Sequence, residues 1–276
     1  MATLTNGPLR GYPGTLLALK GRCMYKWASY APLVPLLFLS LACHTSDVPA
    51  DATPTSAGPE TTPDDSGSPL KTHTAGAKIG DANCAIVLLH GYGAPGTDLL
   101  TLADAFALRG KPVYIFPEAP IQLAQGGRAW YELDGTGFDD SLAQIKQLLN
   151  GLATAHPKCP VVVGGFSQGA TIASNVLDTS NCPTLRAAVL FSPDNFLQHP
   201  PRQREPLPKV LIAHGRNDTV LPFSGAEALR GTLSNLGCET TWVPFDGAHT
   251  ISPEGLRSVN VLLQSVLQTA TGDGAN

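Results

Sequence analysis

Gly165-Phe166-Ser167-Gln168-Gly169 follows the apolar run Val161–Val163 and precedes Ala170–Ala173. A strand, a tight turn and a helix form the context in which Gly-x-Ser-x-Gly presents its serine as a nucleophile. Glycines two positions before and two after the serine carry no side chains that would collide as the chain reverses. The stretch therefore predicts a strand–turn–helix unit with the Ser167 hydroxyl exposed at the end of the strand.

A base and an acid for this serine follow at the ends of two further predicted strands. Asp218 comes after the apolar run Lys209–Ala213, and His249 comes after Thr241–Phe245. Because the carboxyl ends of parallel strands share one edge of a sheet, the three side chains are expected to meet there. The chain order Ser, acid, His is that of α/β-hydrolases, so we predict a Ser167–Asp218–His249 triad. Asp246 and Asp194 stay open as alternatives for the acid.

An earlier strand also ends in a turn of functional interest. Ala85–Leu89 is apolar and leads into His90-Gly91-Tyr92-Gly93. A loop after such a strand is the expected source of the second backbone N–H of an oxyanion hole.

Together these motifs resemble the phospholipase/carboxylesterase family, which includes bacterial carboxylesterases and acyl-protein thioesterases. The segments that carry the resemblance are Leu89–Gly93, Gly165–Ala170, His214–Pro222 and His249–Glu254, with Phe116–Pro120 and Arg128–Tyr131 as two further matches. The likeness covers roughly 84–268. Two positions depart from the family pattern: Ala170 replaces a glycine, and Ala94-Pro95 stands where an acidic residue is usual.

The resemblance implies an α/β-hydrolase fold, a mostly parallel sheet with helices on both faces. It implies a serine hydrolase that cleaves carboxylic esters, or thioesters, through an acyl-enzyme, with no cofactor and no metal. The oxyanion donors would be the backbone N–H groups of Tyr92 and Gln168. Trp130 and Phe191 are candidate walls of the substrate groove, with core packing as the alternative for both. No insertion is long enough for a large lid.

Other functions stay open. A dienelactone-hydrolase-like enzyme, a polyester or feruloyl esterase, and a non-catalytic binding lipoprotein of the cell envelope are the alternatives. The expected partner is a small or lipid-like ester; oligomeric state and acyl chain length are not predicted. Residues 1–43 carry four basic residues and no acid, so removing them changes the net charge from −4 to −8. No basic patch indicates nucleic-acid binding.

Residues 1–43 have the features of an export signal. A basic region precedes the apolar stretch Ala31–Ala42, which is shorter than the roughly 20 residues of a membrane-spanning helix. Cys43 after Ala42 predicts lipidation, with simple cleavage as the alternative, and Met24 is an alternative start to Met1. We therefore expect an exported, membrane-anchored lipoprotein of the cell envelope, facing the periplasm or the exterior.

The remaining chain divides by composition. Residues 44–80 are rich in Pro, Thr, Ser, Asp and Gly, which predicts a disordered tether. Residues 81–270 are expected to form the catalytic domain and 271–276 a tail. Helices are predicted around 142–152, from a capping box at Ser224, and after Ser252-Pro253.

Four cysteines lie outside the leader: Cys84, Cys159, Cys182 and Cys238. An even number in an exported chain predicts two disulfides of undetermined pairing, and free buried thiols are the alternative. Their spacing matches no zinc site.

Overall fold

Continuous apolar runs form the central strands of one sheet, because each strand is covered on both faces. The computed structural model describes residues 70–106, 108, 110–180, 182–202 and 207–272, all within one unit, Thr55–Asn276. Most of the sheet's strands take up apolar runs of the sequence: β2 (Cys84–Leu89), β3 (Pro112–Pro117), β6 (Val161–Phe166), β7 (Leu185–Phe191), β8 (Lys209–Gly215) and β9 (Thr240–Phe245). The predictions for Cys43 and Met24 lie outside the described residues.

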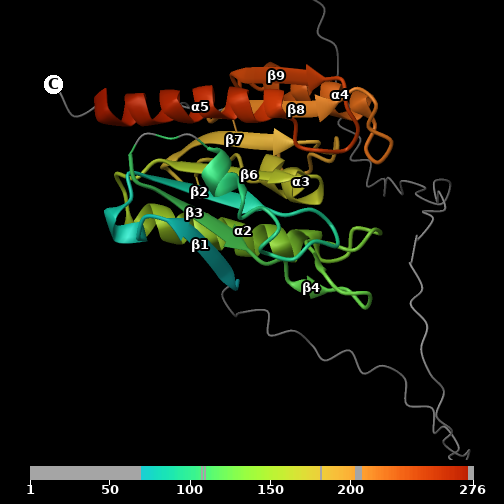
Figure 1. The fold of residues 1–276 in the computed structure, drawn as a ribbon, viewed down its shortest axis with the longest axis horizontal. Helices are drawn as coiled ribbons and strands as arrows, with labels where there is room; N and C mark the ends of the chain where they lie inside the picture. Colours follow the sequence, from blue (N-terminus) through green and yellow to red (C-terminus); the bar gives the residue numbers. More distant parts are fainter. Residues whose placement is uncertain (1–69, 107, 109, 181, 203–206, 273–276) are drawn as a thin grey trace, which may run out of the picture. The chain divides into compact units, whose positions relative to one another are not determined.

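These strands are parallel, in the order β3-β2-β6-β7-β8-β9. The register pairs Val87 with Val163 and Leu190 with Ile212, so neighbouring strands end at a common edge. In Figure 1, the arrows of β7 and β8 point to the same side. The predicted α/β-hydrolase architecture is confirmed.

Helices cover both faces of this sheet. One face packs against α2 (Phe138–Ala155), α3 (Gln168–Ser174) and α4 (Phe223–Asn235). The other packs against α1 (Leu102–Ala105) and α5 (Pro253–Gly272), the long red helix in Figure 1. Among the described residues, none of these helices is long and apolar enough to cross a membrane.

Two helix starts were predicted from capping residues, and one is right. Ser252 caps α5, since its Oγ accepts a hydrogen bond from the Gly255 N–H at 3.0 Å. The predicted capping box at Ser224 is wrong, because α4 begins at Phe223 after Pro222 and has no side-chain cap. With Pro222 in place of Ser224 as the residue before the first turn, the helix starts two positions earlier than the box would place it.

The tether prediction is wrong for residues 72–80. Thr72–Gly76 form β1, an antiparallel edge strand on β3, and Ile79–Asp81 form a 3₁₀ turn, η1. An edge strand with one exposed face is held mainly by backbone hydrogen bonds, so its sequence needs no run of large apolar side chains. The rest of the predicted tether, 44–69, lies outside the described residues.

The loops at the carboxyl edge of the sheet differ in length, and the one between β3 and α2 runs from 118 to 137. Among the described residues, they contain only the small ladder of β4 (Ile121–Gln122) and β5 (Arg128–Ala129), and no helical lid. The site at this edge is therefore not roofed by a large insertion.

The predicted disulfides are not formed among the described residues: Cys84, Cys159 and Cys182 are buried free thiols. The sheet separates one of the four cysteines from the other three. Cys84 packs in the cluster on one face, whereas Cys159, Cys182 and Cys238 pack in the cluster on the other. Burial raises the pKa of Cys84 to about 12, which keeps that thiol protonated and unreactive.

Candidate active site

The predicted strand–turn–helix around Ser167 is present. β6 ends at Phe166, Ser167 has φ 55° and ψ −119°, and α3 begins at Gln168. A non-glycine residue with positive φ is strained, and here two backbone bonds hold it. The Ser167 N–H donates to Phe191 O at 2.9 Å, and Ser167 O accepts from the Thr171 N–H at 3.1 Å.

Glycines make this turn possible because they let two backbone segments approach each other closely. A Cβ at Gly169 would lie 2.2 Å from Leu89 O, and one at Gly165 would lie 2.6 Å from the same atom. Both contacts are to backbone, which has little room to give way. The end of β6 and the start of α3 can therefore pack against the end of β2 only with glycine at these positions.

Asp218 and His249 form the second part of the site. His249 Nδ1 lies 2.7 Å from Asp218 Oδ2, and the other carboxylate oxygen accepts from the N–H groups of Val220 and Leu221 at 2.8 and 2.9 Å. Because a carboxylate only accepts, Nδ1 carries the proton and Nε2 is left with a free electron pair. This is the tautomer that a general base requires.

Phe166, the residue before Ser167, contacts the histidine of this pair. The Phe166 and His249 rings are 4.7 Å apart between centroids. The Ser167 hydroxyl forms no hydrogen bond with another described residue. In the absence of substrate, catalytic hydrogen bonds are often long and tighten only when the complex forms. The roles of all three residues stay predictions.

The rival acids occupy other positions. The Asp246 side chain is 92% exposed and pairs with Arg216 at 3.6 Å, away from His249 Nδ1. Asp194 is half-buried, and burial raises the pKa of its carboxyl. Asp218, with a side chain that is fully buried, is the acid that contacts His249.

Backbone hydrogen bonds tie the loop after β2 to Arg128. The Gly93 N–H donates to Arg128 O at 2.8 Å, and the Arg128 N–H donates to Ala94 O at 3.1 Å. The backbone N–H groups of Tyr92 and Gln168, the predicted oxyanion donors, donate to no described residue.

Trp130 and Phe191 were predicted as candidate walls, and both lie in the core. Trp130 is 0% exposed and Phe191 is 1% exposed. Such burial favours the packing alternative, because neither ring faces a groove. Phe191 acts on the site only through its carbonyl, which accepts from the Ser167 N–H.

Trp130 belongs to a buried polar network under the predicted oxyanion hole. Its indole N–H donates to His90 O at 2.9 Å, and its backbone N–H donates to Gln168 Oε1 at 2.8 Å. The Gln168 amide also donates to Tyr131 O at 2.7 Å. The His90 ring lies between Gly91 O and the Ala119 N–H, at 2.8 and 3.1 Å. The side chain of Gln168 thus ties the start of α3 to the segment after β5.

Sequence reasoning missed one group, an ion cluster around Glu118. Its carboxylate lies 3.0 Å from Lys71 Nζ, 2.8 Å from His73 Nε2 and 3.3 Å from Arg128 Nε. The hydrogen bond from His73 and the nearby cations lower the pKa of Glu118. Arg128 also donates to Ala119 O at 2.8 Å. The cluster therefore links β1 to the loop that presents Tyr92.

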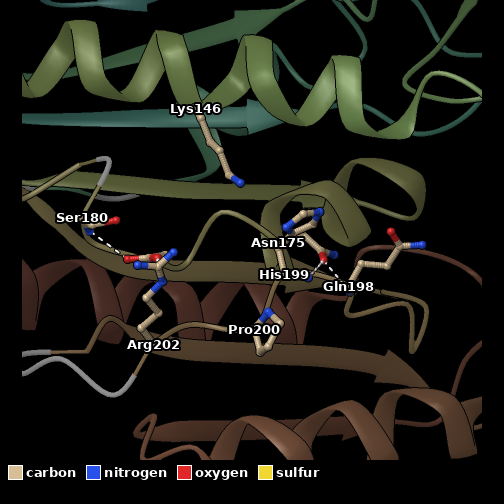
Figure 2. Close-up of a pocket in the computed structure, with 8 residues that line it drawn as sticks. Lys146, Asn175, Ser180, Gln198, His199, Pro200 and Arg202 are labelled. Atoms are coloured by element: carbon tan, nitrogen blue, oxygen red, sulfur yellow. Dashed lines mark hydrogen bonds and ion pairs between the residues drawn. The ribbon is translucent and has the colours of Figure 1, made fainter. Parts of the chain in front are cut away.

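A separate polar cavity of about 290 Å³ is shown in Figure 2. Its lining consists of Lys146, Asn175, Asp178, Ser180, Gln198, His199, Pro200 and Arg202. Arg202 pairs with Asp178 at 3.3 Å, and Asn175 Oδ1 accepts from the N–H groups of Gln198 and His199. None of the candidate catalytic residues lines it, so it is distinct from the site at the edge of the sheet. Within the described residues, no group of His, Cys, Asp and Glu side chains could hold a metal ion.

Known proteins resemble this chain over the same region. A family model described as Phospholipase/Carboxylesterase matches residues 74–267. An acyl-protein thioesterase 1 of Eremothecium gossypii is 28% identical over 204 residues, which is 64% of this chain and 86% of the relative.

Solved structures agree. The crystal structure of esterase PE8 has 25% identity and a TM-score of 0.59, over 72% of this chain and 100% of that one. The crystal structure of Zea mays acyl-protein thioesterase 2 has 25% identity and a TM-score of 0.57, over 72% and 99%. The chain therefore belongs to the phospholipase/carboxylesterase family, as an α/β-hydrolase of the esterase or thioesterase type.

Proposed function

We propose that the protein hydrolyses carboxylic esters through an acyl-enzyme on Ser167, with His249 as general base and Asp218 as the acid that orients it. The observation that carries the proposal is the 2.7 Å contact from Asp218 Oδ2 to His249 Nδ1. It favours an imidazole with Nε2 unprotonated, and the same ring packs against Phe166, the residue before Ser167 in the chain.

In the first half-reaction, His249 Nε2 takes the Ser167 hydroxyl proton as Oγ attacks the carbonyl carbon. The negative charge that develops on the carbonyl oxygen is received by the N–H groups of Gln168 and Tyr92. Loss of one such donor typically costs about 3 kcal/mol of transition-state stabilisation. The imidazolium then passes its proton to the departing alkoxide, which leaves the acyl group on Ser167.

In the second half-reaction, His249 takes a proton from water as the water oxygen attacks the acyl carbon. The tetrahedral adduct collapses, the carboxylic acid leaves, and the proton returns to Ser167 Oγ. Asp218 stays ionised throughout and stabilises the imidazolium.

Thioester hydrolysis is the second candidate, because relatives of this chain carry the name acyl-protein thioesterase. The two reactions share the acyl-enzyme and differ in the leaving atom, a thiolate in place of an alkoxide. A thiolate needs less help from the proton of His249, since thiols are more acidic than alcohols.

A matched pair of substrates separates the candidates. We would measure kcat/KM for a p-nitrophenyl ester and the corresponding thioester, at acyl lengths from acetyl to palmitoyl. Ser167→Ala, Asp218→Asn and His249→Gln should each lose about 10⁴-fold or more on the better substrate. Equal, slow hydrolysis by wild type and Ser167→Ala would refute the enzymatic proposal.

We further propose that the protein is exported and anchored to the cell envelope through a lipidated Cys43. The support is the basic and apolar composition of residues 1–43. Metabolic labelling with a radioactive fatty acid should mark the wild-type protein and not Cys43→Ala. Equal labelling of the two would contradict lipidation at this residue.

A further inference from the structure

A buried histidine precedes the loop that carries Tyr92. His90 directly follows β2 and is 1% exposed. Each of its ring nitrogens contacts one backbone group: Nε2 lies 3.1 Å from the Ala119 nitrogen, and Nδ1 lies 2.8 Å from Gly91 O. The ring therefore has two defined hydrogen-bond partners in the core.

These contacts fix the tautomer of His90. A backbone N–H can only donate, so Nε2 accepts from Ala119 and carries no proton. Burial lowers the pKa of His90 and outweighs the opposing effect of the Gly91 hydrogen bond, so the ring is neutral at pH 7. In the neutral ring the single proton lies on Nδ1, which donates it to Gly91 O.

The Gly91 carbonyl belongs to the same peptide unit as the Tyr92 N–H. A peptide bond is planar and trans, so these two groups point in opposite directions. By holding the carbonyl, His90 sets the direction of the Tyr92 N–H without touching it. The next peptide unit is held as well, because the Gly93 N–H donates to Arg128 O at 2.8 Å.

The same peptide unit lies close to the candidate nucleophile. A Cβ built at Gly91 would be 3.6 Å from Ser167 Cβ and 3.3 Å from a ring carbon of Phe166. The Tyr92 N–H donates to no described residue. The Ala94 N–H also donates to Gly91 O, but at 3.3 Å this bond is longer than the 2.8 Å bond from the imidazole. The imidazole is therefore the closer of the two donors that orient this carbonyl.

The geometry points to His90 as a positioning residue of the oxyanion hole: its Nδ1–H holds the Gly91 carbonyl and thereby keeps the Tyr92 N–H directed at the oxygen that becomes negative when Ser167 attacks. A rotated peptide would present the Gly91 carbonyl instead, and its dipole would repel that oxygen. His90 touches no reacting atom and transfers no proton. This inference rests on the proposed function, in which the Tyr92 N–H receives the oxyanion.

Two amide variants of the full-length protein separate the two contacts of the ring. His90→Asn keeps an N–H near the position of Nδ1 and loses the acceptor for the Ala119 N–H. His90→Gln keeps an acceptor near the position of Nε2 and loses the donor to Gly91 O. Because each variant leaves one buried backbone group without its side-chain partner, both should unfold at lower urea concentrations than wild type, by similar amounts.

The two variants should differ in the hydrolysis of a p-nitrophenyl ester. His90→Gln should lose about 10²-fold in kcat, as expected when one oxyanion donor is misdirected. Both half-reactions pass through an oxyanion, so kcat/KM should fall with kcat while KM stays within about threefold of wild type. His90→Asn should keep kcat at least about tenfold above that of the Gln variant. A histidine that only stabilised the fold would give equal losses.

A folded His90→Gln protein with wild-type kcat would overturn the inference, as would an Asn variant that loses as much kcat as the Gln variant. Should the Gln variant not fold, a folded Asn variant with kcat lowered about 10²-fold would be the contradicting result. Ser167→Ala keeps the two failures apart. If it hydrolyses the ester as fast as wild type, the proposed function fails; if it is inactive while His90→Gln keeps wild-type kcat, only the role of His90 fails.

Discussion

Gly169→Ala is the change that most sharply tests how the site is assembled. The added methyl would lie 2.2 Å from Leu89 O and 2.5 Å from His90 O, whereas real Cβ contacts essentially never fall below 3.0 Å. The start of α3 must therefore move about 0.8 Å from the end of β2. Gln168 moves with α3 and Tyr92 follows β2, so the two predicted oxyanion donors separate.

The size of the effect follows from that displacement. A misplacement of about 1 Å can cost about 10²-fold in rate, and overpacking a tight contact costs about 1–3 kcal/mol of unfolding free energy. We expect kcat/KM for a p-nitrophenyl ester to fall about 10²-fold in a folded protein that unfolds at lower urea concentration. Both quantities are measured on the same preparation, kcat/KM by absorbance and stability by circular dichroism.

Gly151→Ala is the control, because a Cβ there meets nothing within 4 Å and the residue lies inside α2. It should leave kcat/KM unchanged and stabilise the protein by about 0.5–1 kcal/mol. If Gly169→Ala kept wild-type kcat/KM within about twofold, the close packing of α3 on β2 would not be what places the donors.

Three further outcomes are expected. Ser252→Ala should lower the unfolding free energy by about 1 kcal/mol through loss of the α5 cap, while Ser224→Ala should change it by no more than about 0.5 kcal/mol; equal urea midpoints for the two variants would contradict the capping assignment. Gln168→Met leaves the buried backbone N–H of Trp130 without its acceptor, so the unfolding free energy measured in urea should fall by about 1–3 kcal/mol. The value of kcat/KM should also fall as α3 loosens. Unchanged values of both would show that the network does not hold the site. Because the thiols are buried and burial raises the pKa of Cys84 to about 12, Ellman's reagent at pH 8 should react slowly with the native protein and fully after unfolding without a reductant; a requirement for reductant would restore the disulfide prediction.

How well the sequence predicts each structural element depends on the interaction that stabilises that element. The strands β2, β6 and β8 can be predicted from the sequence, because a strand buried on both faces needs a continuous run of apolar residues. Ser167, Asp218 and His249 could be predicted as a triad because strand ends converge at one edge of a parallel sheet; the structure brings Asp218 and His249 into contact.

The missed parts are held by contacts that leave no local pattern. β1 is an edge strand with alternating exposed and half-buried residues, so backbone pairing with β3 places it. The Glu118 cluster joins residues 45 and 47 positions apart in the chain. The disulfide prediction is wrong for Cys84, Cys159 and Cys182, because an even number of cysteines carries no information on where the fold places each thiol.

The central claim, that His249 activates the Ser167 oxygen, is tested most directly by an active-site-directed fluorophosphonate. Mass spectrometry of the full-length protein should find one adduct, on the peptide that contains Ser167, formed rapidly in wild type and at least about 10³-fold more slowly in His249→Gln. An adduct on another residue, or one that forms at Ser167 equally fast without the imidazole, would contradict the account.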